Sequence, residues 1–299
     1  MTKMILAPLR GVTVRCFRET FAAEIAAAGF DEVVTPFVAA MPGVDPARDR
    51  ELRGGPVLPG TGARVTPQFI GKDPAALRSC LEAAKAAGFD TADLNCGCPF
   101  PMVRRKGRGS GILRTPDVLR RMMEAGCEVM GPGRFSVKAR LGVESSDELL
   151  SLMPLINAFP LRFLTVHGRV ARQMYEGACD AAAVRRVVAA ADVPVVLNGD
   201  IPFPPTDEAM RGALEDGVAG FMIGRSFVRS LGARADACDL LRRYVEASRA
   251  ELFGDRPVLG RMKELVSYWT GLPQWRSRWP LLKVASSVDE FCSVLGAQS

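Results

Sequence analysis

Two short segments in the second half of the chain, Asn198-Gly199-Asp200 and Gly224-Arg225, combine residue types that bind phosphate. Glycine lets a ligand approach the backbone closely and leaves its N–H group free, and arginine offers a bidentate donor. No Gly-x-Gly-x-x-Gly follows the first apolar run, so a Rossmann dinucleotide site is not predicted. The two segments therefore predict a site for a phosphorylated cofactor or substrate.

Cysteine and histidine usage limits the chemistry further. The chain has eight cysteines and one histidine, His167, which excludes mechanisms and metal sites that need two histidines. Cys96 and Cys98 form a C-x-C pair without a second pair, so we predict no metal and no disulfide framework. A thiol with an ordinary pKa of about 8.5 is mostly protonated at neutral pH and can act as a general acid, whereas a nucleophilic cysteine needs a histidine partner.

The composition is that of a globular protein with a mildly basic surface. The 299 residues are 48% hydrophobic and 24% charged, with a formal net charge of +6. This charge is compatible with nucleic acid, a nucleotide or a phosphorylated cofactor as partner. No apolar run reaches the roughly 20 residues of a membrane span, and the N-terminus does not resemble a signal peptide. We therefore expect a cytoplasmic monomer that does not bind membranes.

Short apolar runs alternate with longer, helix-patterned stretches over most of the chain. The runs with the composition of strands are Met4–Pro8, Glu32–Phe37, Val65–Ile70, Thr91–Asn95, Phe135–Arg140, Phe163–His167, Val193–Asn198 and Gly220–Gly224. The stretches with helical periodicity include Ala75–Ala87, Thr115–Met130, Asp180–Ala191 and Thr206–Asp216. Asp73-Pro74 and Thr115-Pro116 each place an N-cap residue before a first-turn proline. Eight strands alternating with helices predict an α/β fold, a (β/α)8 TIM barrel.

Two regions depart from this alternation. The segment Ala39–Arg64 is rich in proline, glycine and arginine, and we interpret it as an elaborated connection between a strand and a helix. From about Gly232 the strands stop. Helices are predicted over Asp236–Phe253, Leu259–Thr270 and Asp289–Leu295, with a Trp/Arg/Pro connection at Trp275–Pro280. We therefore predict a barrel domain over residues 1–231 and a small helical domain over residues 232–299.

The active site of such a barrel lies at the carboxyl ends of its strands. The polar and glycine residues at the predicted ends are Pro8-Leu9-Arg10-Gly11, Gln68, Asn95-Cys96-Gly97-Cys98-Pro99, Lys138, Arg140, His167-Gly168-Arg169, Asn198-Gly199-Asp200 and Gly224-Arg225. Strands often end in such residues, which accounts for any one position but poorly for the whole set. Loops after strands seven and eight of a barrel often bind phosphate, which suggests FMN, although many barrels bind phosphorylated substrates instead.

Six short motifs occur in order along the chain. They are Leu6-Ala7-Pro8-Leu9-Arg10-Gly11-Val12-Thr13, Gln68 with Gly71, Asp93-Leu94-Asn95-Cys96-Gly97-Cys98-Pro99, Val137-Lys138-Ala139-Arg140-Leu141-Gly142, Val166-His167-Gly168-Arg169 continuing to Gln173-Met174-Tyr175-Glu176-Gly177, and Asn198-Gly199-Asp200-Ile201 with Ile223-Gly224-Arg225. In order and approximate spacing they resemble the tRNA-dihydrouridine synthase family over nearly the whole chain. Arg261-Met262-Lys263 resembles the family's basic motif in the helical tail. The Asn-Cys-Gly-Cys-Pro form is most similar to the bacterial C-type group.

The resemblance implies an enzyme that uses FMN and NADPH to reduce a uridine of tRNA, in the D loop, to 5,6-dihydrouridine. The positions that it implies for FMN are Pro8, Leu9, Arg10, Gln68, Lys138, His167, Asn198, Gly199, Asp200, Gly224 and Arg225. In this family reduced flavin gives hydride to C6 of uracil, and a cysteine that corresponds to Cys98 protonates C5. Cys98 lies between a glycine and a proline at a strand end, which favours this role, whereas we expect Cys96 to be an ordinary buried cysteine.

Lys138 and His167 are ionisable residues that could each have a structural or a cofactor-binding role. A lysine at the end of an apolar strand is costly unless it is paired. Contact with the flavin would satisfy Lys138 and stabilise the anionic reduced cofactor; the alternative is an ion pair inside the barrel, for example with Asp200. His167 fits a satisfied core histidine or a ligand contact, and the Gly168-Arg169 that follows it favours the second.

A uridine stacked in folded tRNA must leave the stack to reach the barrel, at a cost of about a few kcal/mol. Phosphate contacts must position the RNA. Two basic regions are candidates: the segment Arg104–Gly111, which we expect to be a flexible loop, and the helical tail, where basic residues are interleaved with Trp275 and Trp279. The residues that we predict to bind substrate are Asn95, Arg140, Arg169, Arg104, Arg105, Arg261 and Lys263.

The segment after Cys98 departs from the family pattern. The family usually has lysine two residues after Cys-Pro and then asparagine, where this chain has Pro101 and Arg104; in the first motif, Leu9 and Val14 replace the usual methionine and aspartate. Two other functions remain open. One is an FMN-dependent barrel reductase for a small molecule such as a free pyrimidine or an enone, and the other is an RNA-binding protein without catalysis. The basic tail disfavours the first, and Cys98 disfavours the second.

Overall fold

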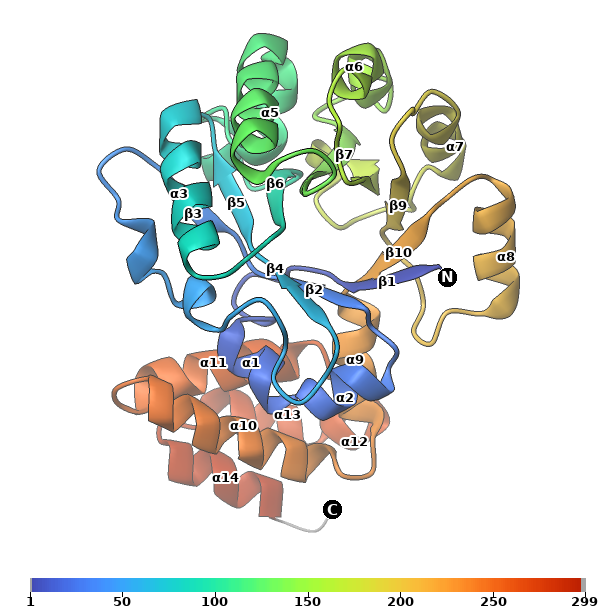
Figure 1. The fold of residues 1–299 in the computed structure, drawn as a ribbon. Helices are drawn as coiled ribbons and strands as arrows, with labels where there is room; N and C mark the ends of the chain where they lie inside the picture. The colour runs from blue at the N-terminus through green and yellow to red at the C-terminus, as the bar shows by residue number, and fades with distance from the viewer. Residues whose placement is uncertain (1, 297–299) are drawn as a thin grey trace.

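The strands form one closed parallel barrel in the computed structural model, which describes residues 2–296 (Figure 1). Its strands are β1 (Lys3–Leu6), β2 (Glu32–Val34), β3 (Val38–Ala40), β4 (Arg64–Thr66), β5 (Gln68–Gly71), β6 (Ala92–Cys96), β7 (Phe135–Gly142), β8 (Leu164–Val170), β9 (Val195–Asn198) and β10 (Gly220–Ile223). Their hydrogen-bonded order is β3-β5-β6-β7-β8-β9-β10-β1-β2-β4. The predicted TIM barrel is confirmed, with two of its strands interrupted.

The interruptions explain why ten strands occupy eight positions. Between β2 and β3 lies a segment that contains Pro36, and Pro67 alone separates β4 from β5, because proline has no N–H group for the ladder. Thr35 bridges the gap: its N–H donates to the carbonyl of Thr66 at 3.0 Å, and its hydroxyl accepts from the N–H of Gln68 at 3.2 Å. Since β4 continues directly into β5, the two ends of the sheet order meet and the ring is closed. The predictions of single strands over Glu32–Phe37 and Val65–Ile70 were wrong in this respect.

Helices surround this ring (Figure 1). They are α1 (Arg15–Thr20), α2 (Ala22–Ala27), α3 (Pro74–Ala86), α5 (Pro116–Met130), α6 (Glu148–Asn157), α7 (Ala181–Ala189), α8 (Asp207–Glu215) and α9 (Arg225–Ala233). The predicted start of α3 is confirmed, since the carboxylate of Asp73 accepts from the N–H groups of Ala75 and Ala76. The helix after Thr115 begins where predicted, but the Thr115 hydroxyl donates back to the carbonyl of Ile112 and does not cap it.

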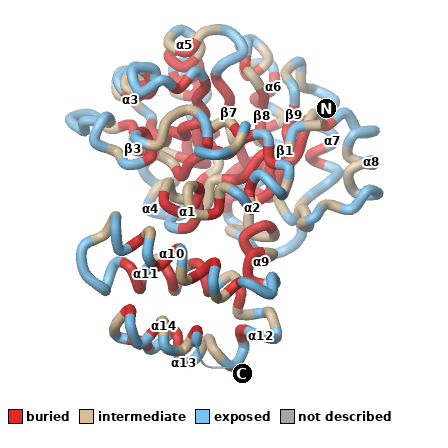
Figure 2. Tube along the Cα trace, turned by 60° about the horizontal axis from the view of Figure 1, so that its bottom comes forward, coloured by how far each residue is buried: buried red, intermediate tan, exposed pale blue. Residues whose placement is uncertain are grey.

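The helical tail packs on one side of the barrel, against α1 and α9 (Figures 1 and 2). It contains α10 (Ala237–Glu251), α11 (Asp255–Ser267), α12 (Pro273–Arg276), α13 (Arg278–Val284) and α14 (Val288–Gly296). The residues around Trp275–Pro280, predicted as a connection, are therefore mostly helical. None of the described helices has the length and apolar character needed to cross a membrane.

Two tryptophans fix the tail to the barrel's last helix. The indole N–H of Trp269 donates to the carbonyl of Val228, and that of Trp275 donates to the carbonyl of Gly232, both at 2.7 Å. Gly232 permits this packing, because a β-carbon at this position would collide with the Trp269 ring. The helix α9 spans the boundary predicted between residues 231 and 232, and one continuous hydrophobic core includes both sides of it. The division into two domains stays a prediction.

The connection predicted at Ala39–Arg64 is anchored by a buried ion pair. It contains two 3₁₀ helices, η1 (Pro46–Arg48) and η2 (Arg50–Arg53). Glu51 of η2 accepts from the guanidinium of Arg18 at 2.6 Å and from the N–H of Arg15 at 3.2 Å. The Arg18 side chain is 2% exposed and that of Glu51 is 11% exposed. This pair ties η2 to α1 at the side of the barrel that faces the tail.

Candidate active site

A cavity of about 1100 Å³ lies at the carboxyl ends of the strands. Its lining includes every residue predicted to hold the cofactor, together with Cys98, Asn95 and Arg140. Most of these residues lie within two residues of a strand end, because a parallel barrel brings its loops together at one face. The structure therefore gathers residues that are more than 200 positions apart, such as Pro8 and Arg225, around one space.

The turn that carries Cys98 is held by a chain of side-chain amides. The Asn95 amide oxygen accepts from the N–H groups of Gly97 at 3.1 Å and Cys98 at 2.8 Å. The amide nitrogen of Asn95 donates to Gln68, whose own amide nitrogen donates to Asp93, each at 2.7 Å. Burial raises the pKa of the Cys98 thiol. The thiol is thus protonated at neutral pH and fixed in position, as a proton donor requires.

Cys96 differs from Cys98 although it is only two residues away. It is fully buried inside the barrel wall and does not line the cavity. Burial raises the pKa of the Cys96 thiol well above its ordinary value. This agrees with the prediction of an ordinary core cysteine.

Lys138 lies deep in the cavity and its ammonium group donates to the side-chain oxygen of Asn198 at 2.8 Å. Burial, followed by the positive charge of Arg140, lowers the pKa of Lys138 to about 8. The alternative partner considered from the sequence, Asp200, instead pairs with Arg169 and Arg225. Lys138 therefore makes no ion pair with a carboxylate of the described residues, although Asp93 is close enough to raise its pKa, and its ammonium group is available to an electron-rich ligand.

His167 has an unsatisfied polar atom at the cavity. The residue is 7% exposed, and burial together with the positive charge of Lys138 lowers its pKa to about 2, so the ring is neutral. Its Nδ1 atom is buried and has no hydrogen-bond partner among the described residues. Buried polar atoms are nearly always bonded in native proteins. The orphaned nitrogen fits a site that is completed by a polar ligand, such as the flavin that the resemblance implies.

The segments after β9 and β10 line the end of the cavity at which the sequence predicts a phosphate site. Gly199 and Asp200 both adopt positive φ, at 107° and 53°, which turns the chain sharply after Asn198. Burial alone would raise the pKa of Asp200, but its hydrogen bond to Arg169 and the positive charges of Arg169 and Arg225 together outweigh burial, and the pKa is lowered. Asp200 also pairs with Arg225 at 3.2 Å, and Arg229 lies one helical turn further along α9 at the same wall. Around Asp200 three guanidinium groups, those of Arg169, Arg225 and Arg229, thus accompany one carboxylate, which suits a bound phosphate.

The profile of the dihydrouridine synthase family (Dus) matches residues 5–230. The chain belongs to the dihydrouridine synthase family. A protein called tRNA-dihydrouridine synthase B from Vibrio cholerae is 30% identical over 226 residues, which are 74% of this chain and 66% of that protein. One called tRNA-dihydrouridine(16) synthase from Cupriavidus necator is 30% identical over 234 residues, 76% of this chain and 71% of that one. The first match thus spans slightly less than two thirds of that relative's length.

Solved structures support the fold of this family member. Morphinone reductase in complex with tetrahydroNAD superposes with a TM-score of 0.54 at 13% identity, covering 76% of this chain and 84% of that one. At this identity the likeness concerns the barrel architecture only. It agrees with the closed parallel ring and with a ligand cavity at the carboxyl ends of its strands.

Several residues predicted to bind substrate lie outside the cavity lining. Arg169 is 3% exposed. Its guanidinium donates to the carbonyls of Glu176 and Gly177 and to the carboxylate of Asp200, so Arg169 stabilises the turn at Gly199 and Asp200. Arg261 pairs with Glu251 at 2.6 Å, and the ammonium group of Lys263 donates to the carbonyl of Ala285 at 2.7 Å. Both tail residues are already bonded within the protein.

The segment after Cys98, predicted as a flexible loop, is folded. It contains α4 (Pro101–Arg104) and the 3₁₀ helix η3 (Gly109–Arg114), whose residues 109–113 are buried. The guanidinium of Arg104 lies 3.7 Å from the carboxylate of Glu144, and Arg105 is exposed. The prediction of a flexible loop was wrong because the glycines that suggested mobility instead allow close packing: a β-carbon on Gly109 would lie 2.7 Å from that of Cys98.

The cavity also contains residues to which the sequence did not assign a role. Tyr175 lies between two guanidinium groups, 5.4 Å from that of Arg140 and 5.1 Å from that of Arg225. Glu264 and Tyr268 reach the cavity from α11, so the tail forms part of its wall. Tyr175 lies in a motif that resembles the family, which was a usable signal. The contribution of α11 depends on tertiary packing and has no local sequence signal.

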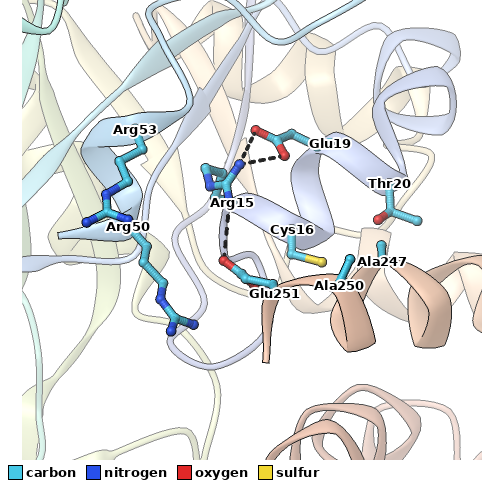
Figure 3. A pocket seen from close by; sticks show the side chains of 9 residues that line it. All are labelled: Arg15, Cys16, Glu19, Thr20, Arg50, Arg53, Ala247, Ala250 and Glu251. Carbon is cyan, nitrogen blue, oxygen red and sulfur yellow. Dashed lines mark hydrogen bonds and ion pairs between the residues drawn. The ribbon is translucent and has the colours of Figure 1, made fainter. Parts of the chain in front are cut away.

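A second cavity, of about 640 Å³, lies between α1, η2 and α10 and shares no lining residue with the first (Figure 3). Arg15 lies within it and pairs with Glu19 at 3.0 Å and with Glu251 at 3.4 Å. Arg50 and Arg53 extend beside them and have no acidic partner among the described residues. This cavity marks the junction of barrel and tail and leaves two cations available at the surface.

Proposed function

We propose that this protein is a tRNA-dihydrouridine synthase that binds FMN in the large cavity and reduces a D-loop uridine of tRNA with electrons from NADPH. One observation carries the proposal: the predicted cofactor residues and Cys98 line a single cavity of about 1100 Å³. That volume is at the upper end of those that bind cofactors and leaves room for a base beside the flavin. The family match over residues 5–230 supports the same reaction.

The residues of the cavity divide into a phosphate end and a ring end. Gly199, Gly224 and Arg225 would hold the FMN phosphate, and Gln68, Lys138 and His167 would hold the flavin ring through their polar atoms. When bound, FMN supplies the hydride that reduces C6 of the uracil. The neutral His167 and the positive Lys138 offer the ring one hydrogen-bonding nitrogen and one charge.

Cys98 would complete the reduction by giving its proton to C5 of the uracil. Asn95 acts on the reaction by holding the Cys98 turn, since both ends of its amide are bonded within the protein. Arg140 donates from Nε to the carbonyl of Gly97 and from Nη1 to that of Val170, each at 3.1 Å. Its Nη2 makes no hydrogen bond with the described residues and is available to a uracil carbonyl.

FMN affinity should depend on pH through Lys138. The pKa of Lys138 is lowered to about 8, so its charge is present below pH 8 and is lost above it. If the bound anion requires that charge, affinity falls by up to about tenfold per pH unit above 8. Flavin fluorescence titrations between pH 6.5 and 9.5 measure the FMN affinity at each pH. The Lys138→Met variant should bind more weakly with no step near pH 8, and a flat wild-type profile contradicts the role given to Lys138.

The RNA would lie across the cavity mouth, with its phosphates on cations that lack acidic partners. Among the described residues such cations are Arg105 and Lys106, which follow the cavity residues Met102 and Val103, and Arg50 and Arg53 at the junction cavity. Arg261 and Lys263 stay predicted RNA contacts, which would have to exchange the internal bonds that they now make. We also infer a monomer, because barrel and tail of one chain together complete the cavity, and a cytoplasmic protein, because its relatives are named as tRNA-modifying enzymes.

Mass spectrometry of bulk tRNA from cells that lack this gene tests the proposed function. Dihydrouridine is about 2 Da heavier than uridine, and we expect its loss from a D-loop fragment and its return when the gene is restored. Unchanged tRNA from a protein that still purifies with flavin would favour a small-molecule flavin reductase. A protein without flavin that still binds tRNA would favour a non-catalytic RNA-binding role.

A further inference from the structure

Three consecutive apolar residues, Phe100, Pro101 and Met102, are exposed directly after the catalytic turn. Phe100 is 44% exposed and Met102 is 80% exposed, and both line the rim of the large cavity. Single exposed apolar side chains are ordinary on protein surfaces. A run of three at the mouth of this cavity, where the family resemblance led us to expect a lysine, suggests contact with an apolar partner.

This apolar lip, defined as Phe100–Met102, is rigidly coupled to Cys98. The carbonyl of Cys98 accepts from the N–H of Ser110 at 3.1 Å and from its hydroxyl at 2.9 Å, which ties η3 to the turn. Pro99 and Pro101 restrict the backbone on both sides of Phe100. The lip therefore keeps a fixed position relative to the Cys98 thiol when substrate arrives.

The surroundings of the lip indicate which partner fits. Arg105 and Lys106 follow it within one helical turn, are exposed, and make no ion pair with the described residues. Arg10, which is exposed and lines the same cavity, lies over the ring of Phe37 at 5.3 Å. Apolar side chains flanked by unpaired cations suit a nucleic-acid strand, because its bases can stack on the apolar side chains while its phosphates pair with the cations.

We propose that Phe100 and Met102 act as a wedge that stacks on the RNA base next to the target uridine and keeps the stack open while the uridine is in the cavity. This inference rests on the proposed function. An extruded base leaves its neighbours unstacked, which opposes binding. Stacking on one base typically changes affinity by about 5- to 150-fold, enough to offset much of that opposition.

The test compares Phe100→Ser, Met102→Ser and the double variant with wild type. The substrates are the full tRNA and a short single-stranded oligoribonucleotide that contains the same uridine, and the measured quantity is kcat/KM for dihydrouridine formation. We expect the double variant to lose about 5- to 150-fold on folded tRNA and clearly less on the oligonucleotide, where fewer stacked neighbours must be separated. Phe100→Trp should retain activity on tRNA, because its ring can still stack.

The matched control is Val57→Ser, which also removes an exposed apolar side chain, 50% exposed, but lies beside Arg64 at the amino end of the barrel strands. It should behave as wild type on both substrates. Flavin content and unfolding temperature report whether each variant is folded, and because both lip residues are exposed, their replacement should leave the fold intact.

Three results overturn the inference, and they are distinguishable. If wild type forms no dihydrouridine in tRNA, the proposed function fails and the wedge fails with it. If wild type is active and the double variant loses equally on both substrates or not at all, the wedge alone fails. If the double variant keeps its activity but changes from dimer to monomer in solution, the lip belongs to a protein interface.

Discussion

Replacing Cys98 with alanine should lower dihydrouridine formation by about 10²- to 10⁴-fold while the protein keeps its flavin. The thiol is the only proton donor of its kind that lines the cavity in the described part of the chain, and its raised pKa keeps it protonated. The turn around it is held through the backbone N–H of Cys98 and its carbonyl, which the substitution leaves in place. The loss should therefore be chemical rather than structural.

Single-turnover experiments separate the two steps that Cys98→Ala might affect. The variant should take up flavin and tRNA as wild type does, and only the conversion of bound uridine should slow. Cys127→Ala provides a control, because Cys127 lies in α5 on the outer ring and away from the cavity. Normal turnover by Cys98→Ala would refute its role as proton donor.

Replacing Glu51 with alanine should destabilise the fold by about 3–5 kcal/mol, the typical cost of leaving one partner of a buried ion pair alone. Arg18 would lose the bond at 2.6 Å and keep only its bond to the carbonyl of Thr13 at 2.9 Å. The backbone N–H of Arg15 would lose its acceptor as well. Urea denaturation gives the free energy of unfolding for each variant.

The double variant Arg18→Met with Glu51→Leu tests the cause of this loss. Because it removes both charges and keeps apolar volume, it should recover most of the stability. Arg249→Ala breaks an exposed ion pair with Asp289 and should leave the unfolding transition where it is. A small loss for Glu51→Ala, equal to that of Arg249→Ala, would mean that water reaches Arg18 in the folded protein.

The strands of the barrel were predictable because each is a short apolar run with a polar or glycine end. The interruption of two of these strands was missed, because Pro36 and Pro67 lie inside runs that otherwise have strand composition. A proline within a run is itself a signal of interruption, because it cannot donate to the ladder. The helices around Trp275 were missed because the closely spaced tryptophan, arginine and proline residues of Trp275–Pro280 suggested a connection, whereas they form short helices that tertiary packing stabilises.

The candidate site was predictable where its residues lie in a strand or just after one, as Lys138, His167 and Cys98 do. Arg169 lies in β8 too, yet its long side chain folds back onto the carbonyl of Gly177 and onto Asp200. Glu264 and Tyr268 belong to a helix of the tail, and their position at the cavity depends on how α11 docks. Sequence thus predicts what a strand end presents, but not where a flexible side chain turns or which distant helix completes the wall.

The docking of the tail on α1 also constrains how the protein is made. The rings of Phe17 and Phe21 in the first helical region pack against Tyr244 of α10, at centroid distances of 5.9 and 5.3 Å. At roughly 5–20 residues per second, a ribosome needs about ten to forty-five seconds between these two points. Through that interval two buried aromatic rings lack their partner. The nascent barrel therefore exposes an apolar surface near its N-terminal end, to which chaperones can bind until the last helices have been synthesised.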